Sequence, residues 1–261
     1  MIGSVLVTGA GGGIGRYIHE ELGGAGFTRR SGNLDELKKR SFDVIVHCAW
    51  NYMPTRLVTN ENFMNYYQDN TLLTQELLQI PHNYFVFFST VDIYPGGEEP
   101  HFEDEVIYAD SLRSIHGVTK MISEAAVRDK ACKFLILRPT SLVGRYMRKN
   151  NLLKLFEDSH PSLSLDASSI YNVIGYSDVL GFIRSVLSAG KTGIFNLAST
   201  HNITLEEITR IVDKDVVFGP NHYEVGNIPN DKAVQIFPVF NRTSEDVLQE
   251  FLSQILKYKT A

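Results

Sequence analysis

The glycine-rich segment TGAGGGIG, residues 8–15, constrains the fold of this chain more than any other feature. It directly follows the apolar run SVLVT and leads into RYIHEEL, a pattern typical of a helix. Glycines so spaced between strand and helix allow a tight turn, close approach of the backbone to a pyrophosphate, and close helix packing. The helix start adds N–H groups and partial positive charge, so the segment predicts a dinucleotide site. The residues expected to contact the dinucleotide here are Gly9, Gly12, Gly13, Ile14 and Gly15.

Short apolar runs alternate with longer helical patterns over the first half of the chain. The runs FDVIVHCA, YFVFFST and KFLILRP are separated by helices that we expect over residues 62–78 and 112–128. Such alternation is typical of parallel βαβ units. Because the runs are continuously apolar, their strands should be buried on both faces. The predicted fold class is therefore α/β, a Rossmann-type doubly wound parallel sheet with a smaller C-terminal substrate-binding lobe.

The pattern loosens after Pro139, where a second lobe is expected to begin. We predict a dinucleotide-binding Rossmann domain over residues 1–140. Residues 141–261 should form mainly the substrate-binding lobe, with about 170–196 returning to the first domain. Two hydroxyl-to-acid pairs, Thr204 with Glu207 and Thr243 with Asp246, have the spacing of a helix start and predict two helices in this half.

Charge and cysteine content exclude several classes of function. The 261 residues carry a formal net charge of −5, and their basic residues are scattered, which makes nucleic acid an unexpected partner. Cys48 and Cys132 lie in or beside apolar runs, which predicts buried thiols in a reducing compartment, and no Cys/His spacing indicates a metal site. The sequence starts without a signal-peptide pattern, and no apolar run approaches the roughly 18 residues of a membrane span. We therefore expect a cytoplasmic protein with no membrane partner.

Two arginines stand where the second strand should end. An acidic residue there would bind a ribose 2′-hydroxyl, but the sequence reads GFTRRSGN and offers Arg29 and Arg30. Guanidinium groups match a 2′-phosphate in charge and in their forked geometry. The expected cofactor is NADP, with NAD as the alternative.

In their order and spacing, these segments resemble the extended short-chain dehydrogenase/reductase family, which contains nucleotide-sugar epimerases, dehydratases and reductases. VIVHCAW is similar to the family strand written HxAA, FFSTVDIYPG to the strand that carries a catalytic hydroxyl, and LRPTSLVG to the stretch after the fifth strand. YSDVLGFI and GIFNLAS resemble later family segments. The resemblance implies further cofactor contacts from Asn33, Leu34, Cys48, Ala49, Trp50, Asn70, Ser89, Lys120, Pro139 and Thr140.

The proton-transfer motif of that family is changed at one position. Family members place a tyrosine four residues before a lysine, and this chain has SIHGVTKMISE, with His116 where the tyrosine would stand. The resemblance implies Thr90 as the hydroxyl that holds the sugar oxygen and Lys120 as the lysine. A spacing of four places His116 and Lys120 on one helical face.

Three interpretations of this change are open. In the first, His116 is the proton donor, with an ordinary pKa of about 6.5 lowered by the nearby Lys120. In the second, Tyr108, Tyr94 or water donates the proton. In the third, the fold binds its cofactor, with or without a sugar nucleotide, and performs no turnover.

The residue pair after Thr90 bears on the reaction. Dehydratases of the family place Asp-Glu there, and this chain has Val91 and Asp92; valine cannot protonate a leaving hydroxyl, which argues against dehydration. The predicted function is therefore an NAD(P)-dependent reduction of a 4-keto sugar, or a 4-epimerisation, on a nucleotide-diphosphate sugar. The alternative is a catalytically silent NADP-binding subunit or sensor.

The resemblance also implies a homodimer formed through helices 62–78 and 112–128. The expected substrate contacts are Asp92, Tyr94, Arg145 and Arg148.

Overall fold

A six-stranded parallel sheet forms the centre of the molecule. The computed structural model describes residues 3–30, 32–51, 53 and 57–259. The strand order is β2-β1-β3-β4-β5-β9, and every neighbouring pair is parallel. The strands are β1 (Val5–Thr8), β2 (Ala25–Phe27), β3 (Phe42–His47), β4 (His82–Phe88), β5 (Phe134–Pro139) and β9 (Gly193–Leu197).

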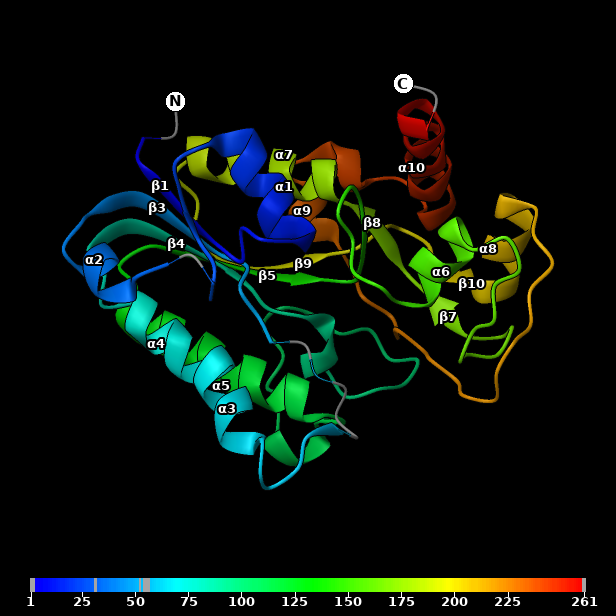
Figure 1. The fold of residues 1–261 in the computed structure, drawn as a ribbon, viewed down its shortest axis with the longest axis horizontal. Coiled ribbons are helices and arrows are strands. Elements are labelled where there is room, and N and C mark those ends of the chain that lie inside the picture. The colour runs from blue at the N-terminus through cyan, green and yellow to red at the C-terminus, as the bar shows by residue number, and fades with distance from the viewer. Residues whose placement is uncertain (1–2, 31, 52, 54–56, 260–261) are drawn as a thin grey trace.

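Helices cover both faces of this sheet (Figure 1). On one face lie α1 (Gly13–Leu22) and α7 (Tyr176–Ser188), and on the other lie α3 (Phe63–Tyr67), α4 (Leu73–Leu77) and α5 (Ile115–Lys130). Separate apolar cores fill the two interfaces, one around Val7, Val46 and Phe182, the other around Ile45 and Phe87. The expected doubly wound α/β fold is confirmed. Its strands are continuously apolar, and such strands require helices on both faces of the sheet.

The helix predicted over residues 62–78 contains a turn of different winding. Between α3 and α4 the backbone forms a π-helical turn, η2 (Gln68–Leu72), which carries the buried Asn70. Such turns inside helices are frequent at functional sites. The short helix α2 (Leu34–Lys38) follows β2 at the edge of the sheet. Short 3₁₀ turns follow β4 and precede α5, η3 (Val91–Ile93) and η4 (Ala109–Ser111).

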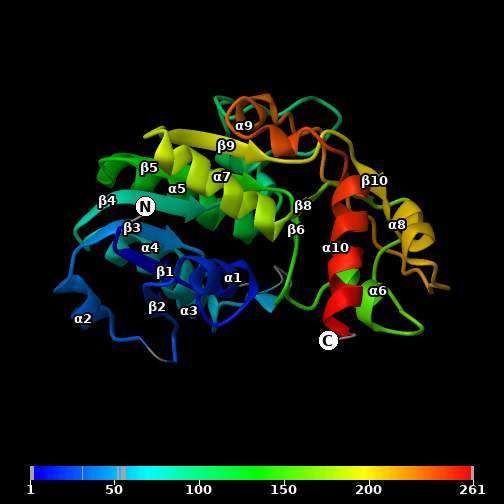
Figure 2. The same ribbon diagram turned by 90° about the horizontal axis from the view of Figure 1, so that it is seen from above.

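The second lobe gathers small elements around its own apolar core (Figure 2). Strand β6 (Ser141–Val143) pairs with β8 (Val173–Gly175), and β7 (Ile170–Tyr171) pairs with β10 (Ile203–Thr204). Helices α6 (Asn151–Glu157), α8 (Leu205–Val212) and α10 (Ser244–Lys259) surround them. Segments from this half also join the main sheet, since β9 is its last strand and α9 (Asp231–Val234) and η5 (Pro238–Phe240) lie beside it.

Both predicted helix starts are confirmed. Thr204 accepts a hydrogen bond from the Glu207 amide while the Glu207 carboxylate accepts from the Thr204 amide, and Thr243 with Asp246 makes the same reciprocal pair before α10. The prediction of two buried thiols is wrong for Cys132, which is exposed because it lies in the turn between α5 and β5; Cys48 is half-buried. Within the described residues, no helix is both long and apolar enough to cross a membrane.

The strand order places a crevice at the carboxyl ends of β1 and β3. The chain leaves β1 toward β2 on one side and later returns to place β3 on the other. Ligands of open α/β sheets bind at such a point of reversal, outside the carboxyl ends of the strands. The glycine loop follows β1 and Cys48-Ala49-Trp50 follow β3, so both segments border this crevice.

Candidate functional site

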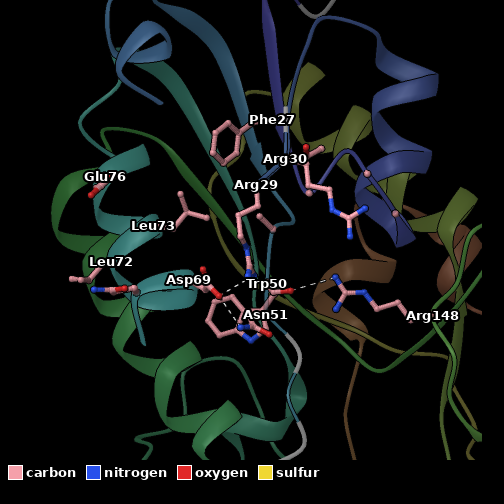
Figure 3. Close-up of a pocket in the computed structure, with 16 residues that line it drawn as sticks. Phe27, Arg29, Arg30, Trp50, Asn51, Asp69, Leu72, Leu73, Glu76 and Arg148 are labelled. Atoms are coloured by element: carbon pink, nitrogen blue, oxygen red, sulfur yellow. Dashed lines mark hydrogen bonds and ion pairs between the residues drawn. The ribbon is translucent and has the colours of Figure 1, made fainter. Parts of the chain in front are cut away.

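A cavity of about 900 Å³ occupies the crevice (Figure 3). The segments after β1, β2 and β3 line it together with the η2 turn, and Arg148 reaches in from the second lobe. Several predicted cofactor contacts are therefore brought together from distant parts of the chain. Those that line the cavity are Gly9, Gly12, Arg29, Arg30, Ala49 and Trp50.

The glycine loop shows why two of its positions lack a side chain. A Cβ on Gly15 would lie 2.5 Å from the carbonyl oxygen of Gly9, so only glycine lets α1 pack this closely on the loop. A Cβ on Gly12 would meet no protein atom within 4 Å, which leaves the cavity side of the loop open. The Gly13 amide, expected to be available to a phosphate, instead donates to the carbonyl oxygen of Tyr146 at 3.0 Å.

The two arginines lie on the β2 side of the cavity, but Arg29 already has a partner. Its guanidinium forms an ion pair of 2.9 Å with Asp69, across the cavity from β2. Arg30 lines the same wall. Asn33 does not line the cavity in this structure, because its side chain caps α2 by accepting from the amides of Asp35 and Glu36. Leu34 packs against the apolar core below.

Asn70 holds the chain that follows β3. Its side-chain oxygen accepts from the Asn51 amide at 2.7 Å and its side-chain nitrogen donates to the Asn51 carbonyl at 3.2 Å. Asn51 is also tied by its side chain to Asp69 at 2.7 Å. Predicted as a cofactor contact, Asn70 is instead fully buried and fixes the backbone next to Trp50.

His47 anchors the end of β3 through two buried threonines. Its Nδ1 lies 2.7 Å from Thr8 Oγ1 and its Nε2 lies 2.9 Å from Thr74 Oγ1. Because the Thr74 hydroxyl donates to the carbonyl of Asn70, it accepts from Nε2–H, which fixes the neutral tautomer of His47. Burial, with a smaller contribution from Lys120, lowers the pKa of His47 to about 3. His47 therefore has a structural role, which the similarity of this strand to the HxAA pattern did not predict.

The predicted catalytic residues meet where α5 approaches η3. A Cβ on Gly117 would lie 2.5 Å from the Asp92 carbonyl oxygen, so glycine permits this close approach. As a result, His116 Nε2 lies 3.9 Å from an Asp92 carboxylate oxygen. Thr90 Oγ1 accepts from the Asp92 amide at 3.1 Å, which holds Thr90 and Asp92 on one turn.

Trp50 covers this cluster from the cavity side. Its Nε1 donates to His116 Nδ1 at 3.0 Å, and the centre of its ring lies 3.4 Å from the amine nitrogen of Lys120. Lys120 is buried and also donates to the carbonyl of Phe88. The HxAA pattern ends in alanine, whereas this chain has Trp50 at the same position. This difference is the sequence feature that could have indicated a special role for Trp50.

The environment of His116 keeps the imidazole neutral. Burial, helped by the charges of Lys120 and Arg148, lowers the pKa of His116 to about 3. Since Nδ1 accepts from Trp50, the neutral ring carries its proton on Nε2, the atom that faces Asp92. Burial also lowers the pKa of Lys120, although the Phe88 carbonyl and the Trp50 ring both favour its charged form.

Two predicted contacts belong to a buried network behind the site. The Ser89 hydroxyl donates to Glu124, which forms a buried ion pair of 2.7 Å with Arg138. Tyr94 donates to Asn196 at 2.7 Å, accepts from Arg138, and is only 3% exposed. Burial raises the pKa of Tyr94 to about 12.

The remaining tyrosine and the end of β5 also lie apart from the cavity lining. Tyr108, the other alternative proton donor, is 67% exposed on the loop before α5. Pro139 and Thr140 are buried at the end of β5, where the Thr140 hydroxyl donates to Asn172 at 2.9 Å. The structure thus brings Trp50 rather than these residues to the boundary between the cavity and the His116 cluster.

The two arginines expected to bind substrate point to different places. Arg148 extends over the glycine loop, and its guanidinium lies 3.4 Å from the carbonyl oxygen of Trp50 (Figure 3). The Arg145 guanidinium stacks on Tyr146, 4.6 Å from the ring centre, beside a second groove between α1 and α10. Only Arg148 therefore reaches the cavity.

The sheet, the glycine loop and the crevice define a Rossmann-type protein with a site shaped for a dinucleotide. More specifically, the chain belongs to the NAD dependent epimerase/dehydratase family, whose family model matches residues 5–157. This match confirms the resemblance to extended short-chain dehydrogenases/reductases and supports an enzyme of that general kind. A comparison with curated protein sequences finds no match.

Solved structures with the same fold cover almost the whole chain. A UDP-glucuronic acid 4-epimerase from Bacillus cereus, solved with UDP-glucuronic acid and NAD, has a TM-score of 0.77 at 18% identity, covering 97% of this chain and 99% of its own. A dTDP-4-dehydrorhamnose reductase from Bacillus anthracis, solved with NADP, has a TM-score of 0.80 at 17% identity, with coverage of 97% and 100%. A dTDP-glucose 4,6-dehydratase from Bacillus anthracis, solved with NAD, has 0.73 at 19%, with coverage of 97% and 96%. At these identities the likeness establishes the fold.

Proposed function

We propose that this protein is an NADP-dependent oxidoreductase or epimerase that acts at C4 of a nucleotide-linked sugar. The observation that carries the proposal is the cluster at the start of α5, where His116 Nε2 lies 3.9 Å from Asp92 beside the Thr90 turn. This cluster borders the dinucleotide cavity through Trp50. Family membership supports the kind of chemistry.

The cavity fits the adenosine and pyrophosphate parts of a dinucleotide. Gly12 leaves the loop open, Arg148 offers a guanidinium to the phosphates, and Arg30 offers one to a 2′-phosphate. A bound nicotinamide cofactor would supply or accept the hydride at the sugar carbon. Arg29 is the weaker candidate for the 2′-phosphate, because Asp69 already neutralises its charge.

The chain's own residues would handle the sugar oxygen and its proton. The Thr90 hydroxyl would donate a hydrogen bond to that oxygen, since its lone pair already accepts from the Asp92 amide. His116 would transfer the proton at Nε2, with the Asp92 carboxylate stabilising the imidazolium form. With Trp50 donating to Nδ1, His116 cannot take up a second proton, so this step requires the indole to move.

The direct test follows NADPH absorbance at 340 nm while the protein meets nucleotide-linked 4-keto-6-deoxy sugars. A parallel assay incubates the protein with UDP- and dTDP-hexoses and separates 4-epimers by chromatography. We expect turnover in one assay, and a loss of at least about 100-fold in His116→Phe, which keeps a ring but carries no transferable proton. A matched control is His19→Phe in α1, whose imidazole lies 3.4 Å from the carbonyl oxygen of Gly24. If His116→Phe leaves turnover unchanged, another group must donate the proton.

A second candidate function is nucleotide binding without turnover. One observation favours it: Trp50 contacts both His116 and Lys120 in the present structure. Tight NADPH binding with no consumption and no epimer formed over the whole panel would support this candidate and overturn the first.

We also propose that the protein forms a homodimer through α3 and α5. Three large apolar side chains are exposed on these helices, with exposed fractions of 38% for Phe63, 55% for Met64 and 37% for Ile122. Light scattering should give a dimer mass that Met64→Asp reduces toward the monomer. A wild-type monomer at micromolar concentration would contradict this proposal.

A further inference from the structure

We propose that Trp50 divides the cofactor site, so that the cavity accepts the adenosine diphosphate half of a dinucleotide directly and admits the nicotinamide riboside half only when the indole leaves Lys120. This inference rests on the proposed function, because it assumes that the cavity binds a nicotinamide dinucleotide. It adds that Trp50 determines whether the site accepts the whole dinucleotide or only its adenosine diphosphate half.

The cavity ends at Trp50. Its described lining runs from Arg29 and Arg30 after β2, past Gly12, to Ala49 and Trp50 after β3. Thr90, His116 and Lys120 do not belong to that lining, and His116 and Lys120 lie behind the indole. A hydride carrier must reach the proton-transfer group to act on one sugar carbon. The nicotinamide must therefore pass the position now held by Trp50.

Two polar contacts hold the indole in place. The Lys120 amine lies 3.4 Å from the ring centre and the Trp50 N–H donates to His116 Nδ1 at 3.0 Å. The rings of Trp50 and His116 meet edge-to-face, 5.7 Å apart at 86°. A cation–π contact and a partly buried hydrogen bond both contribute to the closed arrangement.

The backbone around Trp50 is fixed, so opening should be a rotation of the side chain. Asn70 holds both the amide and the carbonyl of the next residue, Asn51, and Asp69 holds its side chain. Arg148 donates to the Trp50 carbonyl at 3.4 Å and lines the cavity at the glycine loop. A pyrophosphate that binds the Arg148 guanidinium would therefore affect the hydrogen bond from Arg148 to the Trp50 carbonyl, which lies next to the indole.

Opening would prepare the cluster for chemistry. Once the indole leaves, His116 Nδ1 can bind a proton and the Lys120 amine can contact the ribose of the incoming nucleotide. A competent site would then form only with the whole dinucleotide bound, which couples binding to activation.

Trp50 is the sole tryptophan of the chain, so its fluorescence reports the gate directly. Excited at wavelengths that adenine does not absorb, the protein is titrated with ADP and separately with NADP⁺, while calorimetry measures binding of each. We expect ADP to bind without shifting the emission maximum and NADP⁺ to bind with a shift to longer wavelength. Binding of both ligands with no shift from either would overturn the gate and leave cofactor binding intact.

Variants give a second, independent readout. We expect Trp50→Ala to tighten NADP⁺ binding about 10-fold and to change ADP binding less than about 2-fold, because only the larger ligand must displace the indole. Trp50→Phe keeps a ring over Lys120 but loses the N–H, so it should tighten NADP⁺ about 3-fold. Leu72→Ala, on the adenosine side of the cavity, is the matched control and should weaken both ligands alike.

The outcomes separate the gate from the proposed function. If Trp50→Ala binds NADP⁺ no more tightly than the wild type while both proteins bind ADP, the gate is wrong and the site remains a nucleotide site. If neither protein binds either nucleotide, the proposed cofactor and the gate are both overturned. If only Trp50→Ala binds NADP⁺, the indole excludes the dinucleotide and the non-turnover candidate gains support.

Discussion

The indole of Trp50 donates a hydrogen bond to His116 Nδ1 at 3.0 Å while its ring lies over the amine of Lys120. One side chain thereby contacts both His116 and Lys120, the pair predicted to take part in proton transfer. Burial, helped by the charges of Lys120 and Arg148, keeps His116 neutral in the present structure, and the indole separates it from the dinucleotide cavity.

The two neutral histidines should make stability depend on pH. In the folded state the pKa values of His47 and His116 are lowered to about 3 from an ordinary 6.5. Between these values the unfolded chain binds more protons, so the free energy of unfolding falls as the pH drops from 6.5 toward 3. Removing one such group in His116→Phe should reduce the slope in this window by about 1.4 kcal/mol per pH unit. Urea unfolding over this pH range measures it; parallel curves for both proteins would contradict the neutral state of His116.

Arg30 should decide between NADP and NAD. A guanidinium bound to a 2′-phosphate contributes about 1.5–3 kcal/mol as a charge-assisted hydrogen bond, so Arg30→Ala should weaken NADP⁺ binding at least about 10-fold. NAD⁺ has no 2′-phosphate and should bind within about 2-fold of its wild-type affinity. Calorimetry of both ligands tests this, with Arg40→Ala outside the cavity as control. Equal losses for the two cofactors would remove the basis for an NADP preference.

Two glycines of the same loop should respond differently to an added methyl group. Gly15→Ala places a Cβ 2.5 Å from the Gly9 carbonyl and should destabilise the fold by about 1–3 kcal/mol. Gly12→Ala meets no protein atom within 4 Å, so it should leave the melting temperature nearly unchanged and weaken dinucleotide binding. Thermal unfolding and calorimetry on both variants separate the roles. A stable Gly15→Ala protein would show that α1 can move away from the loop.

The buried ion pair behind the site should be costly to break. Glu124 and Arg138 have side-chain exposed fractions of 2% and 4%, so Glu124→Gln leaves a buried guanidinium without its counter-charge. We expect a loss of about 3–5 kcal/mol in the free energy of unfolding. Glu21→Gln, which removes an exposed pair with Arg184, is the matched control and should change stability by less than about 0.5 kcal/mol. Similar small losses in both variants would mean that the Tyr94 and Ser89 hydrogen bonds compensate for the lost charge.

The sequence predicted the elements of the fold because their patterns are local. Continuous apolar runs fixed the positions of β3, β4 and β5, and the reciprocal caps at Thr204 and Thr243 fixed two helix starts. The glycine spacing predicted the loop, since Gly15 meets a steric demand from Gly9 within the same strand–turn–helix unit. These features depend on neighbours a few residues away, which a single sequence displays.

The sequence by itself determined the α/β class and the glycine loop, and it predicts that His116 stands at the tyrosine position of the family motif. Only the tertiary structure decided that Trp50 lies over Lys120, that Asn70 holds Asn51, and that Arg148 reaches the cavity while Tyr94 does not. These relationships join side chains from different strands and helices, and each depends on a rotamer selected by close packing. Spacing along the chain carries no information about such contacts, because they form only once the sheet has brought its carboxyl ends together.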